Sequence, residues 1–96
     1  IGAAATFGEG RDSIVGCIHP RSILDAINTI ISTATIPLDA IFISCTSLKC
    51  ATIIAMAEAQ YGIPVISSNS AVAWDMARLA RLAMPANEKG LLFQQD

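Results

Sequence analysis

Two continuous apolar runs, at 40–44 and 64–67, are separated by stretches of helical periodicity. Runs of this length are typical of strands that a parallel sheet buries on both faces. The stretches 1–6 and 13–18 are also rich in small or apolar residues, and we expect short extended segments there. The glycines and charged residues at 8–12 favour a turn between them.

Three helices are expected around these runs. His19–Pro20 opens the first, because proline suits the first helical position, and Pro37 ends that stretch. The second follows Cys45 directly and continues through Gln60. The third begins at Ser70, whose hydroxyl can accept from free backbone N–H groups.

Each predicted helix carries apolar residues on one face, at spacings of three and four. They are Ile23, Ile27, Ile30 and Ile31 in the first helix, Ile53, Ile54 and Ala57 in the second, and Val72, Met76 and Leu79 in the third. Gly62 suits the C-terminal cap of the second helix. The tail from Met84 to Gly90 is loop-like, and the apolar residues at 91–93 are expected to dock on the domain.

Alternation of strands and helices indicates βαβ units and the α/β class, with a mainly parallel sheet flanked by helices. Ligands of such sheets bind at the carboxyl ends of the strands. The sequence therefore places candidate functional residues at 44–47 and 67–70.

The chain holds 96 residues, enough for one small domain, and its 53% hydrophobic share excludes a disordered tail. A domain of this size buries only about 60% of the surface of its unfolded chain. We therefore expect the apolar excess to be covered by a homo-oligomer or by more of the same polypeptide. Because the chain begins at Ile1, we interpret residues 1–96 as the C-terminal α/β lobe of a longer protein.

Charge and cysteine content limit the classes of binding partner and the cellular compartment. The net charge is −2 and the six Lys and Arg form no basic run, which argues against nucleic acid. Polar residues interrupt every apolar stretch before it reaches the length of a membrane span. The three cysteines lack the spacing of a disulfide framework, which favours the reducing cytoplasm. Together with a single His they offer too few ligands, which argues against a metal site.

Cys45 lies where a buried strand is expected to pass into a helix. Free N–H groups in a first helical turn favour negative charge, and therefore a reactive thiolate. Thr46 and Ser47 add donors suited to a small carboxylate, and Ser68 and Asn69 follow the second strand. The alternatives are an inert buried cysteine and polar side chains that only satisfy turns and caps.

The block DAIFISCTSLKC, from Asp39 to Cys50, resembles the second-cysteine motif of the aspartate/glutamate racemase superfamily. The most similar branch holds maleate cis-trans isomerases, arylmalonate decarboxylases and ectoine-utilisation proteins. The block GIPVISSNSAVAWD, from Gly62 to Asp75, is similar to the strand and helix that follow that motif. The stretches 7–10 and 19–23 are similar in a less specific way.

The resemblance implies two similar α/β lobes with the active site between them, and chemistry without metal or organic cofactor. In racemases and isomerases of this kind, each lobe supplies one cysteine that moves a proton or adds to a double bond. Cys45 would be the catalytic cysteine of the second lobe, and Thr46 and Ser47 would hold a substrate carboxylate. The substrate class implied is a small carboxylate or dicarboxylate of the aspartate, glutamate or maleate type.

Neither Cys17 nor Cys50 matches the first-lobe motif, so we expect the first lobe to be absent from this chain. The sequence thus predicts part of a racemase or cis-trans isomerase, inactive as an isolated chain. Two alternatives stay open. One is a decarboxylase of the same superfamily, which uses a single cysteine to protonate an enediolate. The other is a non-catalytic accessory module that binds small anions.

Overall fold

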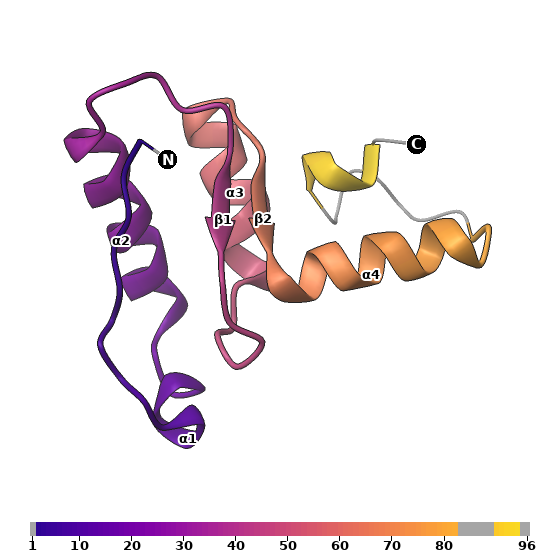
Figure 1. Cartoon of the computed structure of the whole chain (residues 1–96), viewed down its shortest axis with the longest axis horizontal. Helices are drawn as coiled ribbons and strands as arrows, with labels where there is room; N and C mark the ends of the chain where they lie inside the picture. Colours follow the sequence, from indigo (N-terminus) through magenta and orange to yellow (C-terminus); the bar gives the residue numbers. More distant parts are fainter. Residues whose placement is uncertain (1, 83–89, 95–96) are drawn as a thin grey trace.

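A computed structural model describes residues 2–82 and 90–94 of the chain (Figure 1). Its elements, in chain order, are α1 (Asp12–Val15), α2 (Pro20–Thr33), β1 (Ile41–Ile43), α3 (Ala51–Tyr61), β2 (Val65–Ser67), α4 (Ser68–Leu79) and the 3-10 helix η1 (Leu91–Gln94). The predicted loop at 84–90 falls, apart from Gly90, outside the described residues.

The sheet consists of β1 and β2, which pair in parallel with Ile41 opposite Val65 and Ile43 opposite Ser67. Helix α3 connects them, so both strands end at the same edge of the sheet (Figure 1). This arrangement confirms the predicted α/β class with a parallel sheet flanked by helices.

One face of the sheet packs against α3, and α2 packs against α3. The buried residues of this core are Val15, Ile23, Leu24, Ile27, Ile41, Ile43, Leu48, Cys50, Ile53, Ile54, Ala57 and Val65. On the opposite face Phe42 is 62% exposed. The prediction of a strand buried on both faces is therefore wrong for β1 within the described residues, because its Phe42 side is left uncovered.

The start of α2 agrees with the sequence pattern. His19 is the N-cap, and its Nδ1 accepts a hydrogen bond from the backbone N–H of Arg21 at 3.0 Å. Pro20 occupies the first turn, where a missing N–H costs nothing. The helix ends at Thr33, a few residues before the predicted stop at Pro37.

Helix α3 begins later than predicted. Cys50 is its N-cap, and residues 45–50 form a loop rather than a first helical turn. Leu48 and Cys50 explain the difference, because both side chains are buried in the core. Two residues apart on a helix they would point about 200° away from each other, so both reach the core only if the chain is not helical there. The predicted cap at Gly62 is confirmed by its left-handed φ of 71°.

Helix α4 begins immediately after β2, three residues earlier than a cap at Ser70 would place it. Its N-cap is Ser67, not Ser70. The Ser67 hydroxyl accepts from the Ser70 N–H at 3.1 Å, and the Ser70 hydroxyl accepts from the Ser67 N–H at 2.9 Å. This reciprocal pair is a capping box with serine in place of the usual acidic residue.

The expected extended segments near the N-terminus are wrong. Residues 2–10 run beside α2 (Figure 1) and form no regular element. Among the described residues, no strand lies beside them with which they could pair. Residues 12–15 form the short helix α1 instead, where the Arg11 carbonyl accepts from the N–H groups of Ile14 and Val15. This turn carries Val15 into the core. At the other end, η1 packs against β2 and α4, so residues 91–93 dock on the domain as expected.

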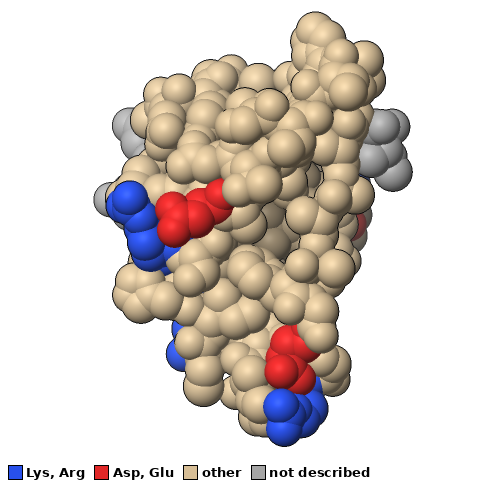
Figure 2. Space-filling view, turned by 90° about the vertical axis from the view of Figure 1, so that its left-hand side faces the viewer, with Lys and Arg blue, Asp and Glu red and all other residues tan. Residues whose placement is uncertain are grey.

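Charged side chains on this molecule pair locally. Among the described residues, ion pairs join Arg11 to Glu9, Arg21 to Asp25, and Arg78 to Asp75. Figure 2 shows the same pattern on one face, where acidic and basic side chains lie side by side and most of the surface carries neither.

Candidate active site

Cys45 lies two residues beyond β1, at the edge where both strands end. Its side chain is half-buried and its backbone φ is 154°, a value that residues with a Cβ rarely adopt. Strained backbone of this kind is held in place by surrounding contacts and is concentrated at functional sites. The geometry thus singles out the residue that the sequence had placed at the centre of the site.

Hydrogen bonds join the loop after β1 to the start of α4. The Cys45 N–H donates to the Ser68 hydroxyl at 3.1 Å, and the Asn69 amide donates to the Thr46 carbonyl at 3.0 Å. The Ser47 N–H points at the Cys45 sulfur, with 3.4 Å between N and Sγ. Ser68 and Asn69 therefore position the cysteine loop, and Ser47 offers a donor that stabilises negative charge on the sulfur.

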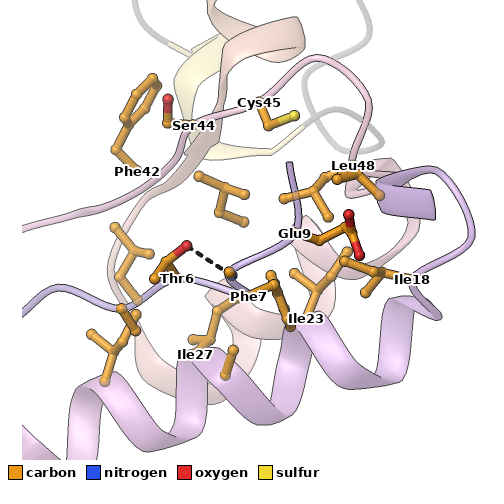
Figure 3. A pocket seen from close by; sticks show the side chains of 17 residues that line it. Thr6, Phe7, Glu9, Ile18, Ile23, Ile27, Phe42, Ser44, Cys45 and Leu48 are labelled. Carbon is orange, nitrogen blue, oxygen red and sulfur yellow. Dashed lines mark hydrogen bonds between the residues drawn. The ribbon is translucent and has the colours of Figure 1, made fainter. Parts of the chain in front are cut away.

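The Cys45 side chain lines a cavity of about 280 Å³ (Figure 3), which we call the Cys45 cavity. Its walls come from the segment at 5–9, from α2 and from β1. They are mostly apolar, with Val15, Ile18, Ile23, Ile27, Ile30, Phe7 and Leu48 among them. A thiol therefore opens into a space suited to an apolar group.

Of the four predicted substrate-binding residues, Ser68 lines neither of the two cavities, and the other three line a different cavity from Cys45. Thr46, Ser47 and Asn69 line a space of about 660 Å³ on the other side of the loop, together with Lys49 and Phe93. Leu48 lines both cavities. The structure thus brings the predicted residues together through backbone contacts, but it does not place Cys45 and the hydroxyls of Thr46 and Ser47 in one cavity.

Two titratable groups near the loop have pKa values that differ from their ordinary ones. Burial raises the pKa of the Cys50 thiol, and the nearby charge of Cys45 raises it further. Hydrogen bonds from the Arg11 side chain and backbone lower the pKa of Glu9. Cys50 is thus held as a neutral thiol and Glu9 as a carboxylate at neutral pH.

Two acidic residues gained no site role from the sequence. Glu9 lines the Cys45 cavity. Glu58 is buried, and its carboxylate accepts from the Val65 N–H at 3.0 Å and from the Leu91 N–H at 2.9 Å. The helical spacing could have predicted that Glu58 is buried, because it lies four residues after Ile54, on the buried face of α3.

Other classes of site find no counterpart in the described residues. No group of three His, Cys, Asp or Glu side chains there is arranged to hold a metal ion. None of the described helices has both the length and the apolar character needed to cross a membrane.

Comparison with known proteins places this site in a family. The sequence model of arylmalonate decarboxylase matches residues 13–93, which include Cys45 and both strand ends. The chain belongs to the arylmalonate decarboxylase family. That family is part of the aspartate/glutamate racemase superfamily, so the resemblance found in the cysteine block is confirmed.

Solved structures of the arylmalonate decarboxylase family agree. The chain superimposes on a crystal structure of arylmalonate decarboxylase with a TM-score of 0.78 at 26% identity, covering 95% of this chain and 40% of that one. A glycine-to-cysteine variant in a sulfate-associated form gives a TM-score of 0.79 at 26% identity, with coverage of 95% and 39%. The chain thus spans about 40% of the length of these decarboxylases. No curated protein matches it.

Proposed function

We propose that this chain forms the cysteine-bearing lobe of an enzyme that decarboxylates a malonate with an apolar substituent, with Cys45 as the proton donor. The observation that carries the proposal is the position of the Cys45 side chain, which lines an apolar cavity at the strand edge. The family match to arylmalonate decarboxylase supplies the reaction type.

The chemistry requires one acid. Loss of CO₂ from a substituted malonate leaves the electron pair of the broken C–C bond on the α-carbon, as an enediolate. The Cys45 S–H gives its proton to that carbon, which yields the monocarboxylic acid and a thiolate. The Ser47 N–H stabilises this thiolate, and a proton from water restores the thiol. The apolar cavity receives the substituent and keeps water from the carbanion.

The racemase or isomerase function predicted from the sequence needs a second acid–base group on the opposite side of the substrate carbon. Within the described ranges, Cys17 does not line the Cys45 cavity, and Cys50 faces the cavity on the other side of the loop. A one-cysteine reaction uses only what this chain holds at the site. In racemases and isomerases of this superfamily the other lobe supplies that group, so the choice of the decarboxylase rests on the match to the arylmalonate decarboxylase family.

Ligand protection of the thiol tests the proposal without requiring turnover. We expect phenylmalonate at millimolar concentration to slow iodoacetamide labelling of Cys45, and to shift the backbone amide signals of residues 45–48. Malonate should do so more weakly, because it has no group for the apolar cavity. Labelling of the exposed Cys17 serves as the internal control, since it should not change.

The same titration separates the alternatives. Stronger protection of Cys45 by aspartate, glutamate or maleate than by phenylmalonate would support the racemase or isomerase. Unchanged amides and labelling with every ligand would refute a substrate site at Cys45. Protection by any small anion alike, malonate and sulfate included, would indicate a binding module without a site for the apolar group.

A further inference from the structure

Among the described residues that line the Cys45 cavity, Glu9 is the charged one. The proposed decarboxylation gives this carboxylate no role. Its position in a largely apolar wall is unfavourable for binding a purely apolar group, because such a ligand removes water from the carboxylate and offers it no hydrogen-bond donor.

Arg11 holds the Glu9 carboxylate in place by hydrogen bonds. Its Oε1 accepts from the backbone N–H of Arg11 at 3.0 Å and from Arg11 Nε at 3.1 Å. The Arg11 side chain is 72% exposed and the Glu9 side chain is 27% exposed, so Glu9 is the less exposed member of the pair. In Figure 3 the Glu9 carboxylate lies beside Leu48 and Ile18, away from Phe42 and Ser44.

One carboxylate oxygen keeps room for a ligand. The Arg11 Nη2 lies 3.4 Å from Glu9 Oε2, a longer contact than the two at Oε1. A carboxylate oxygen can accept more than one hydrogen bond, so Oε2 can receive another from a group in the cavity. A donor bonded to an ionised carboxylate makes one of the stronger hydrogen bonds available to a ligand.

The charge of Glu9 also orients a substrate. A malonate carries two carboxylates, which are repelled by a third in the same cavity. The apolar substituent, being uncharged, is therefore the part of the substrate that approaches Glu9.

We propose that Glu9 is a specificity-determining residue, which selects substrates whose apolar substituent carries an O–H or N–H donor, such as a hydroxyaryl group. This inference rests on the proposed function. A ligand with such a donor gains a hydrogen bond to an ionised carboxylate, which the analogue that lacks the donor cannot form.

Matched ligands test the donor. The full chain is titrated with phenylmalonate and with its 4-hydroxy, 4-amino and 4-methoxy derivatives, while the amide signals of residues 45–48 report binding. The methoxy compound resembles the hydroxy compound in shape but has no donor. We expect the hydroxy compound to bind about tenfold more tightly than the methoxy compound, the difference that one charge-assisted hydrogen bond provides. The amino compound shows whether an N–H donor serves as well.

Variants assign the effect to Glu9. In Glu9→Ala the hydroxy-to-methoxy ratio should fall to about one, and Glu9→Gln, which keeps an acceptor oxygen, should retain part of the preference. Asp25→Asn is the control, because Asp25 is also paired with an arginine but lies outside the cavity.

Two results would overturn the inference and leave the proposed function standing. One is equal binding of the hydroxy and methoxy compounds by the unmodified chain, with both shifting the amides. The other is a preference that survives in Glu9→Ala. Amides that no arylmalonate shifts would refute the proposed function, and the specificity of Glu9 with it.

Discussion

At the scale of single residues, the two cysteines that bracket the loop differ sharply. Cys45 is half-buried beside an N–H donor, whereas Cys50 is 3% exposed and its pKa is raised, first by burial and then by the charge of Cys45. Reaction with an alkylating agent requires both access and a thiolate. These two conditions favour Cys45 over Cys50.

We expect iodoacetamide at neutral pH to label Cys45 and to leave Cys50 unlabelled in the folded chain. Mass mapping over a pH series checks this order. Exposed Cys17 is the reference for an accessible thiol, and its sulfur donates only to the Ser13 carbonyl. Faster labelling of Cys50 than of Cys45 would contradict the assignment of the reactive thiol.

Alkaline pH should destabilise the fold through Cys50. Its folded-state pKa lies above the ordinary value of 9.0, so the unfolded chain loses this proton at lower pH than the folded chain. The contribution to stability is complete below pH 9 and is lost as pH rises through the folded-state pKa. Denaturant unfolding between pH 8 and pH 10.5 should show a decline that Cys50→Ala reduces. Cys45→Ser should reduce it less, because burial is the larger cause.

The positions of the candidate residues in the fold followed from the sequence more closely than their distribution between the two cavities. Cys45, Ser68 and Asn69 lie at neighbouring strand ends as expected, because two parallel strands joined by one helix must end at the same edge. The separation of Thr46 and Ser47 from the Cys45 cavity could not be predicted. It depends on the loop conformation that the burial of Leu48 imposes.

At the scale of elements, the sequence signals that worked are local ones. Proline after His19 and glycine at 62 act through the backbone of their own turn, and both helix ends lie where expected. The secondary-structure predictions were wrong where a tertiary contact determines the local conformation. Val15 is drawn into the core by α1 where an extended segment was expected, and Ser67 both ends β2 and caps α4.

The capping box of α4 should contribute measurably. Ser67→Ala removes the acceptor for the Ser70 N–H, and we expect it to lower the free energy of unfolding by about 1 kcal/mol. Ser32→Ala is the control, since its exposed hydroxyl bonds a carbonyl within α2 and caps nothing. Equal effects of the two substitutions in denaturant unfolding would show that the cap contributes nothing specific.

Glu58 connects three elements, because it lies on α3 and accepts N–H groups at β2 and η1. Gly90 lies against the same carboxylate, where an added Cβ would stand 2.9 Å from the Ile54 side chain. We expect Glu58→Ala to lower the free energy of unfolding by about 2–4 kcal/mol, because it leaves a buried N–H without a partner. Glu58→Gln should cost less, since one oxygen remains to accept.

Amide hydrogen exchange at Leu91 separates local from global effects of these substitutions. Faster exchange at Leu91 than at Ile53 in Glu58→Ala would show release of η1 from the domain. Gln60→Ala, at an exposed position of the same helix, is the control. A loss of stability no larger than that of Gln60→Ala would contradict the role of Glu58.

At the scale of the whole molecule, the fold class follows from the strand and helix alternation, whereas the exposed surface does not. The sequence assigned Val72, Met76 and Leu79 to a shared apolar face, but these side chains are 56–70% exposed. Helix α4 extends away from the sheet after β2 (Figure 1), so no described element covers this face. The three residues share a helical face as predicted, and the described part of the chain leaves that face exposed.

We expect the chain to self-associate through this face of α4. Large apolar side chains of Val72, Met76, Leu79 and Leu82, together with Phe42 on the open side of the sheet, are exposed beyond half of their area. Each such side chain gains about 1.5–3 kcal/mol when fully removed from water, so covering several offsets the entropy lost on association. Sedimentation at micromolar concentration should therefore reveal species larger than a monomer.

The double variant Met76→Lys and Leu79→Lys should sediment as a monomer, because charges resist burial in an apolar interface. Thr29→Lys with Ser32→Lys adds the same charge at exposed polar positions of α2 and should leave the association unchanged. A monomer at every concentration for the unmodified chain would rule out self-association. Association that persists in the α4 variant and is lost in the α2 variant would place the interface on α2 instead.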